Sequence, residues 1–277
     1  MSISRKIIKL AKKIAPRWLK NNLKSSFEIS AQSPFEIKSV GHQNFIQIDE
    51  DSNLFCTEAS SFDFHHIFNH DFPEVTSFIN LAKDKVCLLD VGASRGVYSC
   101  IFNKINPDGI AYAFEGSAQS CAAITELAEK NLITDQIKVN ECMVGDHNGK
   151  GLFSLESCGY VQILENETLK KVEKNIISLD SFCLENNLTP DFIKIDVEGY
   201  EFEVIKGSQS ILKEFSPVIL LELHLSYLDQ RGIYPEKILK FLTESSYQIS
   251  DIQNNPISFS KINSSLQTTI HLIANPS

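Results

Sequence analysis

The segment from Val86 to Gly96, taken together with Glu115, constrains this chain most. An apolar run, VCLLDV, leads into a turn of small residues, GASRG, and a helix-compatible stretch then leads to a second apolar run, IAYAFE, which ends on Glu115. This order predicts a strand, a tight glycine turn, a helix and a second strand with a carboxylate at its tip. Such a unit is typical of nucleoside sites, because the turn lets a ligand approach the backbone and the acid accepts both ribose hydroxyls. An ordinary strand-to-helix turn of an α/β protein is the alternative.

The spacing within the turn favours S-adenosylmethionine over a dinucleotide. Dinucleotide sites use G-x-G-x-x-G, in which a helix N-terminus meets a pyrophosphate. Here the glycines are spaced G-x-x-x-G and an acid, Asp90, precedes them, which would repel phosphate and attract the ammonium of an amino acid. The candidate cofactor-binding residues are Asp90, Gly92, Ala93, Ser94, Gly96, Tyr98, Glu115, Gly116, Ser117, Met143 and Asp196.

Apolar runs and amphipathic segments alternate through the rest of the chain. Strands are expected at 86–91, 110–115, 137–142, 191–196 and 217–224, helices at 96–105, 117–130, 200–213 and 235–244, and two final strands at 247–252 and 268–274 with no helix between them. The pattern therefore predicts an α/β, Rossmann-like methyltransferase fold. It has a mostly parallel seven-stranded sheet, an antiparallel C-terminal hairpin and helices on both faces.

Two regions are expected along the chain. Residues 1–80 would form an N-terminal extension with a basic amphipathic helix, a small β-hairpin within 35–58 and a helix around Pro73 to Leu81. Residues 81–277 would form the S-adenosylmethionine-dependent methyltransferase domain.

The N-terminal segment is strongly basic. Residues 1–24 contain eight Lys or Arg and no acid, and Ile3, Ile7 and Trp18 fall on the apolar face of a helix over 3–23. Such a helix can lie peripherally on an anionic membrane surface. A mobile or domain-packed helix with a solvated basic face is the alternative.

Composition excludes several classes of protein. The net charge of −9, which is more negative still without the basic segment, argues against nucleic acid as a partner. No apolar run reaches the ~18 residues of a membrane span, and no secretory h-region begins the chain. The seven cysteines form no C-x-x-C pair, as in reduced proteins. We expect a cytoplasmic protein, peripheral at the inner membrane surface if the basic helix binds there.

Two late strands end on chemistry-bearing residues. FIKIDVEG supplies Asp196 and Glu198, and ILLELH supplies Glu222 and His224, which share one side of a strand because they are two residues apart. Together they could act in general-base catalysis, with Glu222 orienting His224, or Asp196, Glu222 and His224 could hold a divalent cation such as Mg²⁺ or Mn²⁺. A helix-capping Glu198 and a loop histidine are the alternative. Lys194, inside the strand FIKID, is expected either to snorkel or to pair with an acid nearby.

These segments together resemble the FkbM family of methyltransferases. The matching stretches are DVGASRGVYS (90–99), AYAFEGS (111–117), VGDHNG (144–149), ISLDSF (177–182), FIKIDVEGYEFEVIKGSQSIL (192–212) and PVILLELH (217–224). The resemblance implies methyl transfer from S-adenosylmethionine to oxygen, with sugar or natural-product hydroxyls as acceptors. The family usually has Asn at the position of Ser94 and Pro or a similar residue at that of Gly116.

The sequence therefore predicts an S-adenosylmethionine-dependent O-methyltransferase that acts on a sugar, glycan or glycolipid hydroxyl. Asp196 is the expected base, assisted by His224. A non-catalytic cofactor- or glycan-binding protein with a degenerate methyltransferase fold is the alternative, and the glycine spacing disfavours an NAD-linked oxidoreductase.

Overall fold

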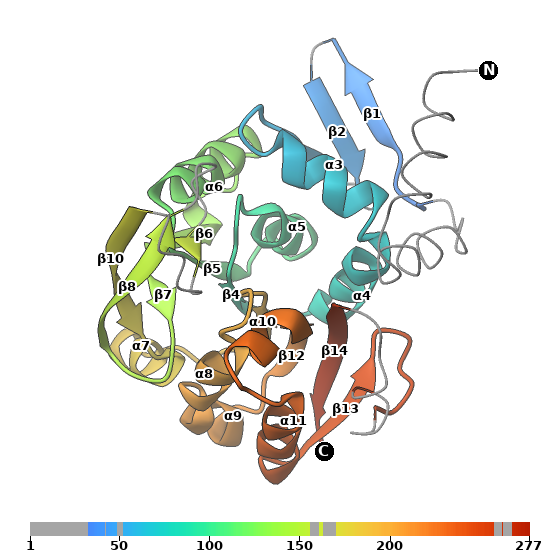
Figure 1. Ribbon diagram of the computed structural model, residues 1–277. Helices are drawn as coiled ribbons and strands as arrows, with labels where there is room; N and C mark the ends of the chain where they lie inside the picture. The colour runs from blue at the N-terminus through green and yellow to red at the C-terminus, as the bar shows by residue number, and fades with distance from the viewer. Residues whose placement is uncertain are drawn as a thin grey trace, which may run out of the picture. The chain divides into compact units, whose positions relative to one another are not determined.

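The computed structural model describes residues 33–41, 43–48, 52–155, 161–162, 170–257, 262 and 268–277 (Figure 1). The expected basic helix at 3–23 lies outside these residues. Residues 35–277 form one compact unit. Within the described residues, none of the helices combines the length and the apolar character that a membrane span requires.

A seven-stranded sheet forms the centre of this unit, in the order β13-β14-β12-β11-β4-β5-β6. Its strands are β4 (Cys87–Val91), β5 (Ile110–Glu115), β6 (Ile137–Glu141), β11 (Phe192–Ile195), β12 (Val218–His224), β13 (Tyr247–Asp251) and β14 (Thr269–Pro276). The pairs from β12 to β6 are parallel, and β14 is antiparallel to both β12 and β13. The expected mostly parallel sheet with a C-terminal antiparallel hairpin is confirmed.

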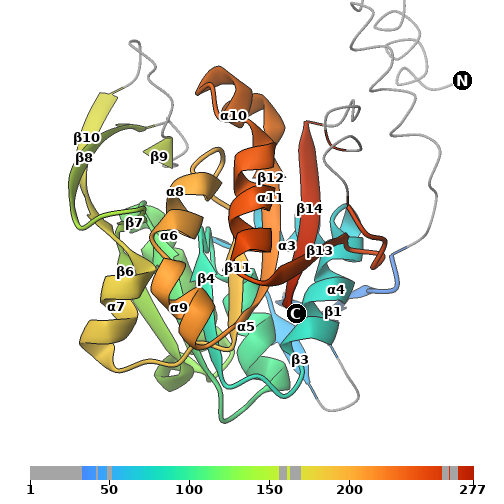
Figure 2. The same cartoon turned by 90° about the horizontal axis from the view of Figure 1, so that it is seen from below.

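The strand order reverses beside β4, because β5 and β6 extend the sheet to one side and β11 and β12 extend it to the other. Ligands of open α/β sheets bind outside the carboxyl ends of the strands at such a point. In Figure 2, α10 lies at the top of the view and begins directly after β12 ends at His224. The top of that view is therefore the carboxyl edge of the parallel strands.

Helices cover both faces of the sheet (Figure 1). Their bounds are α3 (Ser61–Asn69), α4 (Phe72–Ala82), α5 (Val97–Ile105), α6 (Ala118–Lys130), the 3₁₀ turn η1 (Thr134–Gln136), α7 (Leu179–Asn186), α8 (Glu201–Lys206), α9 (Gln209–Glu214), α10 (Leu225–Gln230) and α11 (Pro235–Glu244). Successive strand residues point to opposite faces. Leu88 and Phe192 accordingly join the core under α3 to α6, whereas Leu89 and Ile193 join the core under α7, α8, α9 and α11.

Two smaller sheets flank the main one. The first has the order β1-β2-β3, with β1 (Ile37–Val40), β2 (Gln43–Gln47) and β3 (Asn53–Phe55). The second has the order β7-β10-β8-β9, with β7 (Met143–Val144), β8 (Gly149–Leu155), β9 (Val161–Gln162) and β10 (Lys170–Ile177). The first sheet contains the expected hairpin as β2 and β3, and β1 adds a third strand.

Three details differ from the sequence prediction. The helix expected at 200–213 is two helices, α8 and α9, because at Gly207 the chain passes so close to Gly145 that a Cβ would lie 2.0 Å from its carbonyl oxygen. Helix α3 was not anticipated. Residues 35–80 do not form a separate extension, since Ile46, Phe64 and Phe78 are fully buried in the same core as the sheet.

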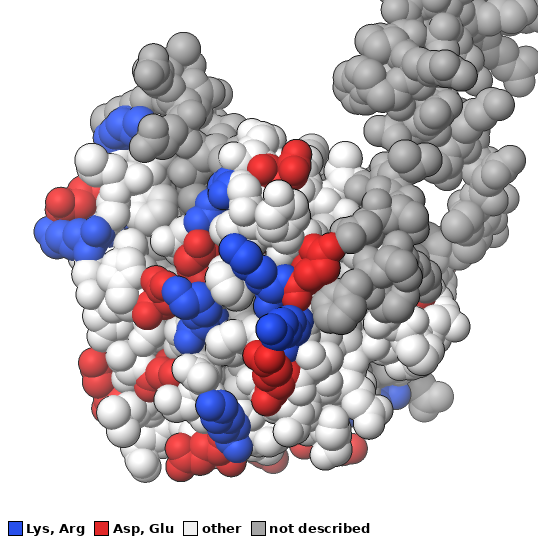
Figure 3. All heavy atoms as spheres, turned by 60° about the horizontal axis from the view of Figure 1, so that its bottom comes forward, with Lys and Arg blue, Asp and Glu red and all other residues white. Residues whose placement is uncertain are grey.

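Charged side chains are mixed on the surface. On the face drawn in Figure 3, the described Lys and Arg side chains lie among Asp and Glu side chains rather than in one continuous area.

Candidate functional site

A cavity of about 330 Å³ opens at the carboxyl ends of β4, β5, β11 and β12. This volume lies within the range of small-molecule sites, ~300–1,000 Å³. The lining residues from the sheet edge and α5 are 91–95, 97, 98, 114–116, 142–144, 194, 196–198, 200, 222 and 224, and those from α3, α4 and the turn between them are 62, 63, 66, 67, 71 and 74. Most residues singled out from the sequence therefore share one cavity.

Backbone geometry accounts for the two glycines of the turn. Gly92 has φ +79°, and a Cβ there would lie 1.7 Å from the carbonyl oxygen of Asp196. Gly96 has φ +80°, and its Cβ would lie 2.9 Å from the side chain of Ile124. The backbone N–H of Gly92 donates to the carbonyl of Phe114 at 3.0 Å. The first glycine thus lets β4 and β11 meet at the cavity floor, and the second lets α5 begin against α6.

The backbone holds the carboxylate of Glu115 at the tip of β5. Oε1 accepts a hydrogen bond from the N–H of Ser117 at 2.8 Å, and Oε2 accepts one from the N–H of Ser94 at 3.0 Å. Burial raises the pKa of Glu115 to about 7, although both N–H groups favour the charged form. Because Glu115 lines the cavity, its remaining lone pairs can accept hydrogen bonds from a ligand.

Asp63 of α3 ties that helix to the glycine turn. Its Oδ2 accepts from Ser94 Oγ at 2.7 Å, and its Oδ1 accepts from Arg95 Nη1 at 2.6 Å. The side chain of Ser94, a predicted cofactor residue, is therefore engaged with α3, while its backbone N–H serves Glu115. No sequence pattern links Asp63 to Ser94, because they are 31 residues apart.

The lining formed by the described residues does not include Asp90, so the expected direct contact with a cofactor ammonium needs correction. Asp90 is only 1% exposed, and its Oδ2 accepts from Ser99 Oγ at 2.6 Å. It pairs in register with Lys194 across β4 and β11, and burial raises its pKa. Asp90 thus belongs to the layer of charge beneath the cavity.

Gly96 and Ser117 also lie outside the lining formed by the described residues. Ser117 is 3% exposed, and its Oγ accepts from the N–H of Ser120 at 3.3 Å, as an N-cap of α6. Both residues therefore shape the site through the backbone rather than through a side chain in the cavity.

Glu201 positions His224. Glu201 is completely buried at the start of α8, and its Oε1 lies 2.8 Å from His224 Nδ1 and accepts from the N–H of Gly199 at 2.9 Å. Burial alone would lower the pKa of His224, but the hydrogen bond to Glu201 and the charges of Asp196 and Glu222 raise it to about 9. The ring is thus a cation at neutral pH. Its Nε2 lies 3.8 Å from Asp196 Oδ1 and 3.6 Å from Glu222 Oε1.

The orienting role expected of Glu222 therefore falls to Glu201. Glu222 and His224 do line the same cavity, as their two-residue spacing predicts. Burial, reinforced by the charge of Asp196, raises the pKa of Glu222 to about 8. Glu198 also lines the cavity, with φ +48° in the turn that follows β11.

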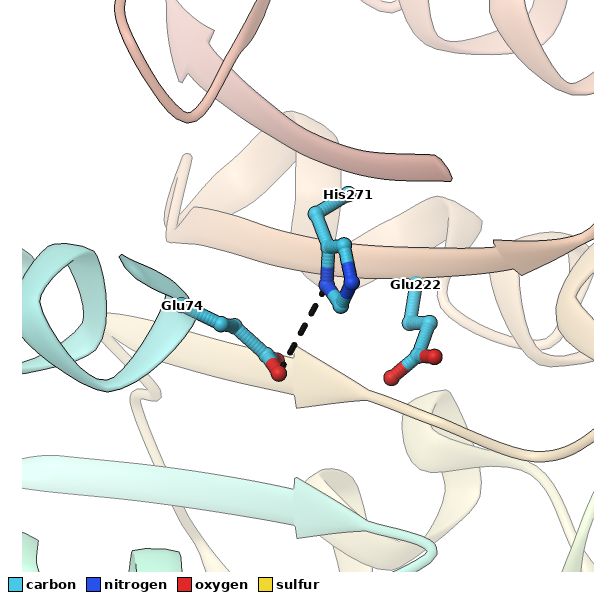
Figure 4. A group of neighbouring side chains, drawn as sticks. All are labelled: Glu74, Glu222 and His271. Carbon is cyan, nitrogen blue, oxygen red and sulfur yellow. Dashed lines mark ion pairs between the residues drawn. The ribbon is translucent and has the colours of Figure 1, made fainter. Parts of the chain in front are cut away.

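A second layer of charge lies beneath these residues. Lys194 is 2% exposed, and its Nζ lies 3.2 Å from Asp196 Oδ2 and 3.9 Å from Glu74 Oε1, which confirms the expected pairing with a nearby acid. Glu74 accepts from Tyr98 Oη at 2.9 Å, and His271 Nδ1 lies 3.5 Å from its Oε2 (Figure 4). Burial alone would raise the pKa of Glu74, but Lys194 and His271 lower it to about 2.

Two groups of described side chains bring three metal-binding atoms within 4.8 Å of one another. They are Asp196, Glu222 and His224, which the sequence indicates, and Glu74, Glu222 and His271 (Figure 4). Carboxylate oxygens and imidazole nitrogens suit divalent cations. Both groups, however, contain a carboxylate that already contacts the Lys194 ammonium.

Sequence reasoning missed Glu201, Glu74 and His271. A signal for Glu201 is present, because D-V-E-G-Y-E places a second acid three residues after Glu198 at the start of a helix. Glu74 and His271 have no comparable signal, since they lie on α4 and β14, 197 positions apart in the chain.

A family model described as the methyltransferase FkbM domain matches residues 90–249. The chain belongs to the FkbM methyltransferase family. The match includes the glycine turn, Glu115 and the ends of β11 and β12, so the resemblance indicated by the sequence is confirmed.

One curated protein and two solved structures are similar to this chain at low identity. The hexuronic acid methyltransferase AglP of Haloferax volcanii is 27% identical over 171 residues, which cover 59% of this chain and 64% of that protein. The chain thus spans less than two thirds of this curated relative. An FkbM methyltransferase structure from Methylobacillus flagellatus has a TM-score of 0.49 at 14% identity, covering 79% of this chain and 55% of that one. A precorrin-6y C5,15-methyltransferase structure from Geobacter metallireducens has a TM-score of 0.44 at 17% identity, covering 74% of this chain and 87% of that one.

Proposed function

We propose that this protein is an S-adenosylmethionine-dependent O-methyltransferase that acts on a hydroxyl of a sugar, glycan or glycolipid. A hydroxyl of another natural product could accept the methyl group by the same reaction. The observation that carries the proposal is that Glu115 and the group of Asp196, Glu222 and His224 line one cavity. The former suits a ribose and the latter suits a hydroxyl that must lose a proton.

The glycine turn and Glu115 would hold the cofactor. The predicted cofactor residues that line the cavity are Gly92, Ala93, Ser94, Tyr98, Glu115, Gly116, Met143 and Asp196. Glu115 would accept the ribose hydroxyls, and Met143 with its apolar neighbours would contact the adenine. When bound, S-adenosylmethionine supplies a methyl group on a sulfonium, and a cavity rich in carboxylates favours that positive charge.

Helix α3 and the turn that follows it would receive the acceptor. Phe62 is 72% exposed although it lines the cavity, and His66 and Asp71 line it nearby. An exposed ring beside polar groups suits a pyranose, which has an apolar face and a hydroxylated edge. The similarity to AglP, a hexuronic acid methyltransferase, also favours a sugar.

The charge of the cavity favours a sugar without a carboxylate. Its lining contains two permanent cations, Arg95 and Lys194, and each already contacts an acid: Arg95 contacts Asp63 at 2.6 Å and Lys194 contacts Asp196 at 3.2 Å. A uronic acid would therefore find both permanent cations already engaged with acids, and neither could bind a second carboxylate without giving up part of an existing contact.

Asp196 is the proposed base. Its side chain is 31% exposed, with Oδ2 on Lys194 and Oδ1 facing His224. Asp196 would take the proton from the acceptor hydroxyl, while the His224 imidazolium, held by Glu201, would donate a hydrogen bond that orients the acceptor oxygen. Proton transfer by a positioned side chain contributes ~10²- to 10⁴-fold to the rate.

Calorimetric titration and a transfer assay test the proposal. The wild type should bind S-adenosylhomocysteine but not NAD, and should transfer labelled methyl from S-adenosylmethionine to neutral or amino sugars more readily than to uronic acids. Asp196→Asn should keep cofactor affinity and lose ~10²- to 10⁴-fold in kcat. Binding without transfer to any sugar fraction would favour the non-catalytic binding protein, and NAD binding would favour the oxidoreductase.

We also propose a cytoplasmic enzyme whose basic segment at 3–23 contacts anionic membrane, with no nucleic-acid partner. The support for membrane contact is the eight basic residues without an acid in residues 1–24. The net charge of −9 and the mixed charge on the face drawn in Figure 3 argue against nucleic acid. In vesicle co-sedimentation, the full chain should pellet with anionic but not neutral vesicles, and a chain starting at Ser25 should stay in solution. Equal pelleting of both would refute the membrane contact.

A further inference from the structure

Lys194 is a buried cation that the proposed chemistry does not yet use. It lies within β11, is 2% exposed, and lines the floor of the cavity. Its Nζ lies 3.2 Å from Asp196 Oδ2, 3.9 Å from Glu74 Oε1 and 4.4 Å from the centre of the Tyr98 ring. An ammonium is removed from water at this depth only where several acids compensate it.

Four carboxylates from four elements act on the Lys194 ammonium through their negative charge. Glu74 comes from α4, Asp90 from β4, Asp196 from the end of β11 and Glu222 from β12, and all four raise the pKa of Lys194 against the effect of burial. Asp90 is the residue of β4 that pairs with Lys194 in register. The acids that could hold a metal thus converge on a cation that belongs to the chain.

Two histidines complete the balance of charge. The ring of His271 faces Glu74, with Glu222 beside it (Figure 4), and His224 contacts Glu201. Their carboxylate partners raise the pKa of each histidine to about 9, although burial alone would lower it. Three basic side chains, Lys194, His224 and His271, thus lie among the acids of the cluster.

We propose that the Lys194 ammonium is the resident cation of this cluster, takes the place of a divalent metal, and positions Asp196 as the base. This inference rests on the proposed methyl transfer. Lys194 is a positioning residue, because it acts on the acceptor only through Asp196. It engages Oδ2 and leaves Oδ1, which lies 3.8 Å from His224 Nε2, for the proton of the acceptor.

A metal and this ammonium would compete for the same oxygens. Asp196 and Glu74 each belong to one of the two three-residue groups that could hold a metal, and each already contacts Lys194. A divalent cation there would lie beside the Lys194 ammonium, which is buried and cannot move into solvent. Bulk water does not screen the repulsion between the two positive charges in this buried site. Removing the ammonium should therefore create a metal site.

The test compares Lys194→Met, which keeps an unbranched side chain one atom shorter and removes the charge, with Lys240→Met as the matched control. Lys240 lies on α11, with its side chain 70% exposed. Mn²⁺ binding is followed by electron paramagnetic resonance, and S-adenosylhomocysteine binding by calorimetry. Methyl transfer is measured as kcat, KM and a pH profile, with and without EDTA.

Wild type and Lys240→Met should keep full activity in EDTA and bind Mn²⁺ weakly. Lys194→Met should bind Mn²⁺ at least ~10-fold more tightly. It should also lose ~10²-fold or more in kcat with little change in cofactor affinity, and its acidic limb of kcat should move to higher pH. A merely structural lysine would not shift that limb.

Loss of wild-type activity in EDTA with recovery in Mn²⁺ or Mg²⁺ would overturn the proposal, and so would a Lys194→Met enzyme with the metal affinity and pH profile of the control. If Lys194→Met does not fold, the wild-type measurements in EDTA and Mn²⁺ decide alone. If the wild type neither binds the cofactor nor transfers methyl, the proposed function is refuted. Tight Mn²⁺ binding to the wild type would refute the role of Lys194, whether or not the protein transfers methyl.

Discussion

Glu115 makes the proposed cofactor affinity depend on pH. Burial raises its pKa to about 7 in the free protein, so the carboxylate that would accept the ribose hydroxyls becomes protonated just below neutrality. Cofactor affinity should therefore fall as the pH falls, because protonation converts the Glu115 carboxylate, which can bind the ribose hydroxyls, to the neutral acid. Glu222, with a pKa of about 8, also loses its negative charge as the pH falls from 8 to 6, so only the part of the slope that Glu115→Gln removes belongs to Glu115. His224, with a pKa of about 9, stays a cation over this range.

The size of the effect follows from the ionised fraction. One unit below its pKa, a carboxyl is about one-tenth ionised, so apparent affinity should fall ~10-fold between pH 8 and pH 6. The loss has a ceiling, because a protonated carboxyl still makes neutral hydrogen bonds. A charge-assisted hydrogen bond is worth ~1.5–3 kcal/mol, which limits the total loss to ~10- to 100-fold.

Isothermal titration of S-adenosylhomocysteine at several values from pH 5.5 to 8 measures this dependence. Glu115→Gln should bind ~10- to 100-fold more weakly at pH 8 and show no comparable slope. Its amide N–H must also face the N–H of Ser94 or of Ser117, so thermal unfolding should be recorded alongside. Glu126→Gln, on the exposed side of α6, is the matched control and should behave as wild type. A flat wild-type profile, or the same slope in Glu115→Gln, would refute the assignment of Glu115.

Two further predictions concern the cavity floor and the histidine. Gly92→Ala would place a Cβ 1.7 Å from the Asp196 carbonyl at φ +79°, so it should lower the free energy of unfolding by ~2–4 kcal/mol and abolish cofactor binding. Gly232→Ala, with φ +66° and open space around it, should cost only ~1–2 kcal/mol in denaturant titration, and equal losses would contradict the close approach. Glu201→Gln should lower the pKa of His224 from about 9 toward its usual 6.5. Because His224 is needed as a cation, the alkaline limb of kcat should then move down by ~1–2 pH units, and an unmoved limb would show that Glu201 does not set that pKa.

Helix α3 shows why part of the site escapes sequence analysis. The helix is nine residues long, and some of its side chains line the cavity while others are buried in the core. Its Asp63 accepts a hydrogen bond from Ser94 of the glycine turn, 31 residues later in the chain. A short helix with two histidines, whose N-cap Ser60 makes no side-chain capping hydrogen bond, is hard to distinguish from a loop, because propensity alone is weak over so few residues. Packing against the turn and against α4 stabilises it instead.

The sequence by itself determined the elements and the local features. The alternation of apolar runs, the glycines at 92 and 96 and the acid at the end of β5 all depend on neighbours within a strand or a turn. A mostly parallel sheet with an antiparallel C-terminal hairpin could therefore be predicted from them, but its strand order could not. The two-residue spacing of Glu222 and His224 likewise placed both in the cavity.

Only the tertiary structure decided which charges meet. Glu201 and His224 are brought together because α8 begins beside the end of β12, and Lys194 meets Glu74 because α4 packs over β11. Asp90 has the spacing of a ligand-binding acid, yet its register with Lys194 places it in the buried layer. A pattern along one chain fixes which face a side chain occupies, but electrostatic partners depend on distances through space, and those distances exist only after the sheet is ordered and its helices are packed.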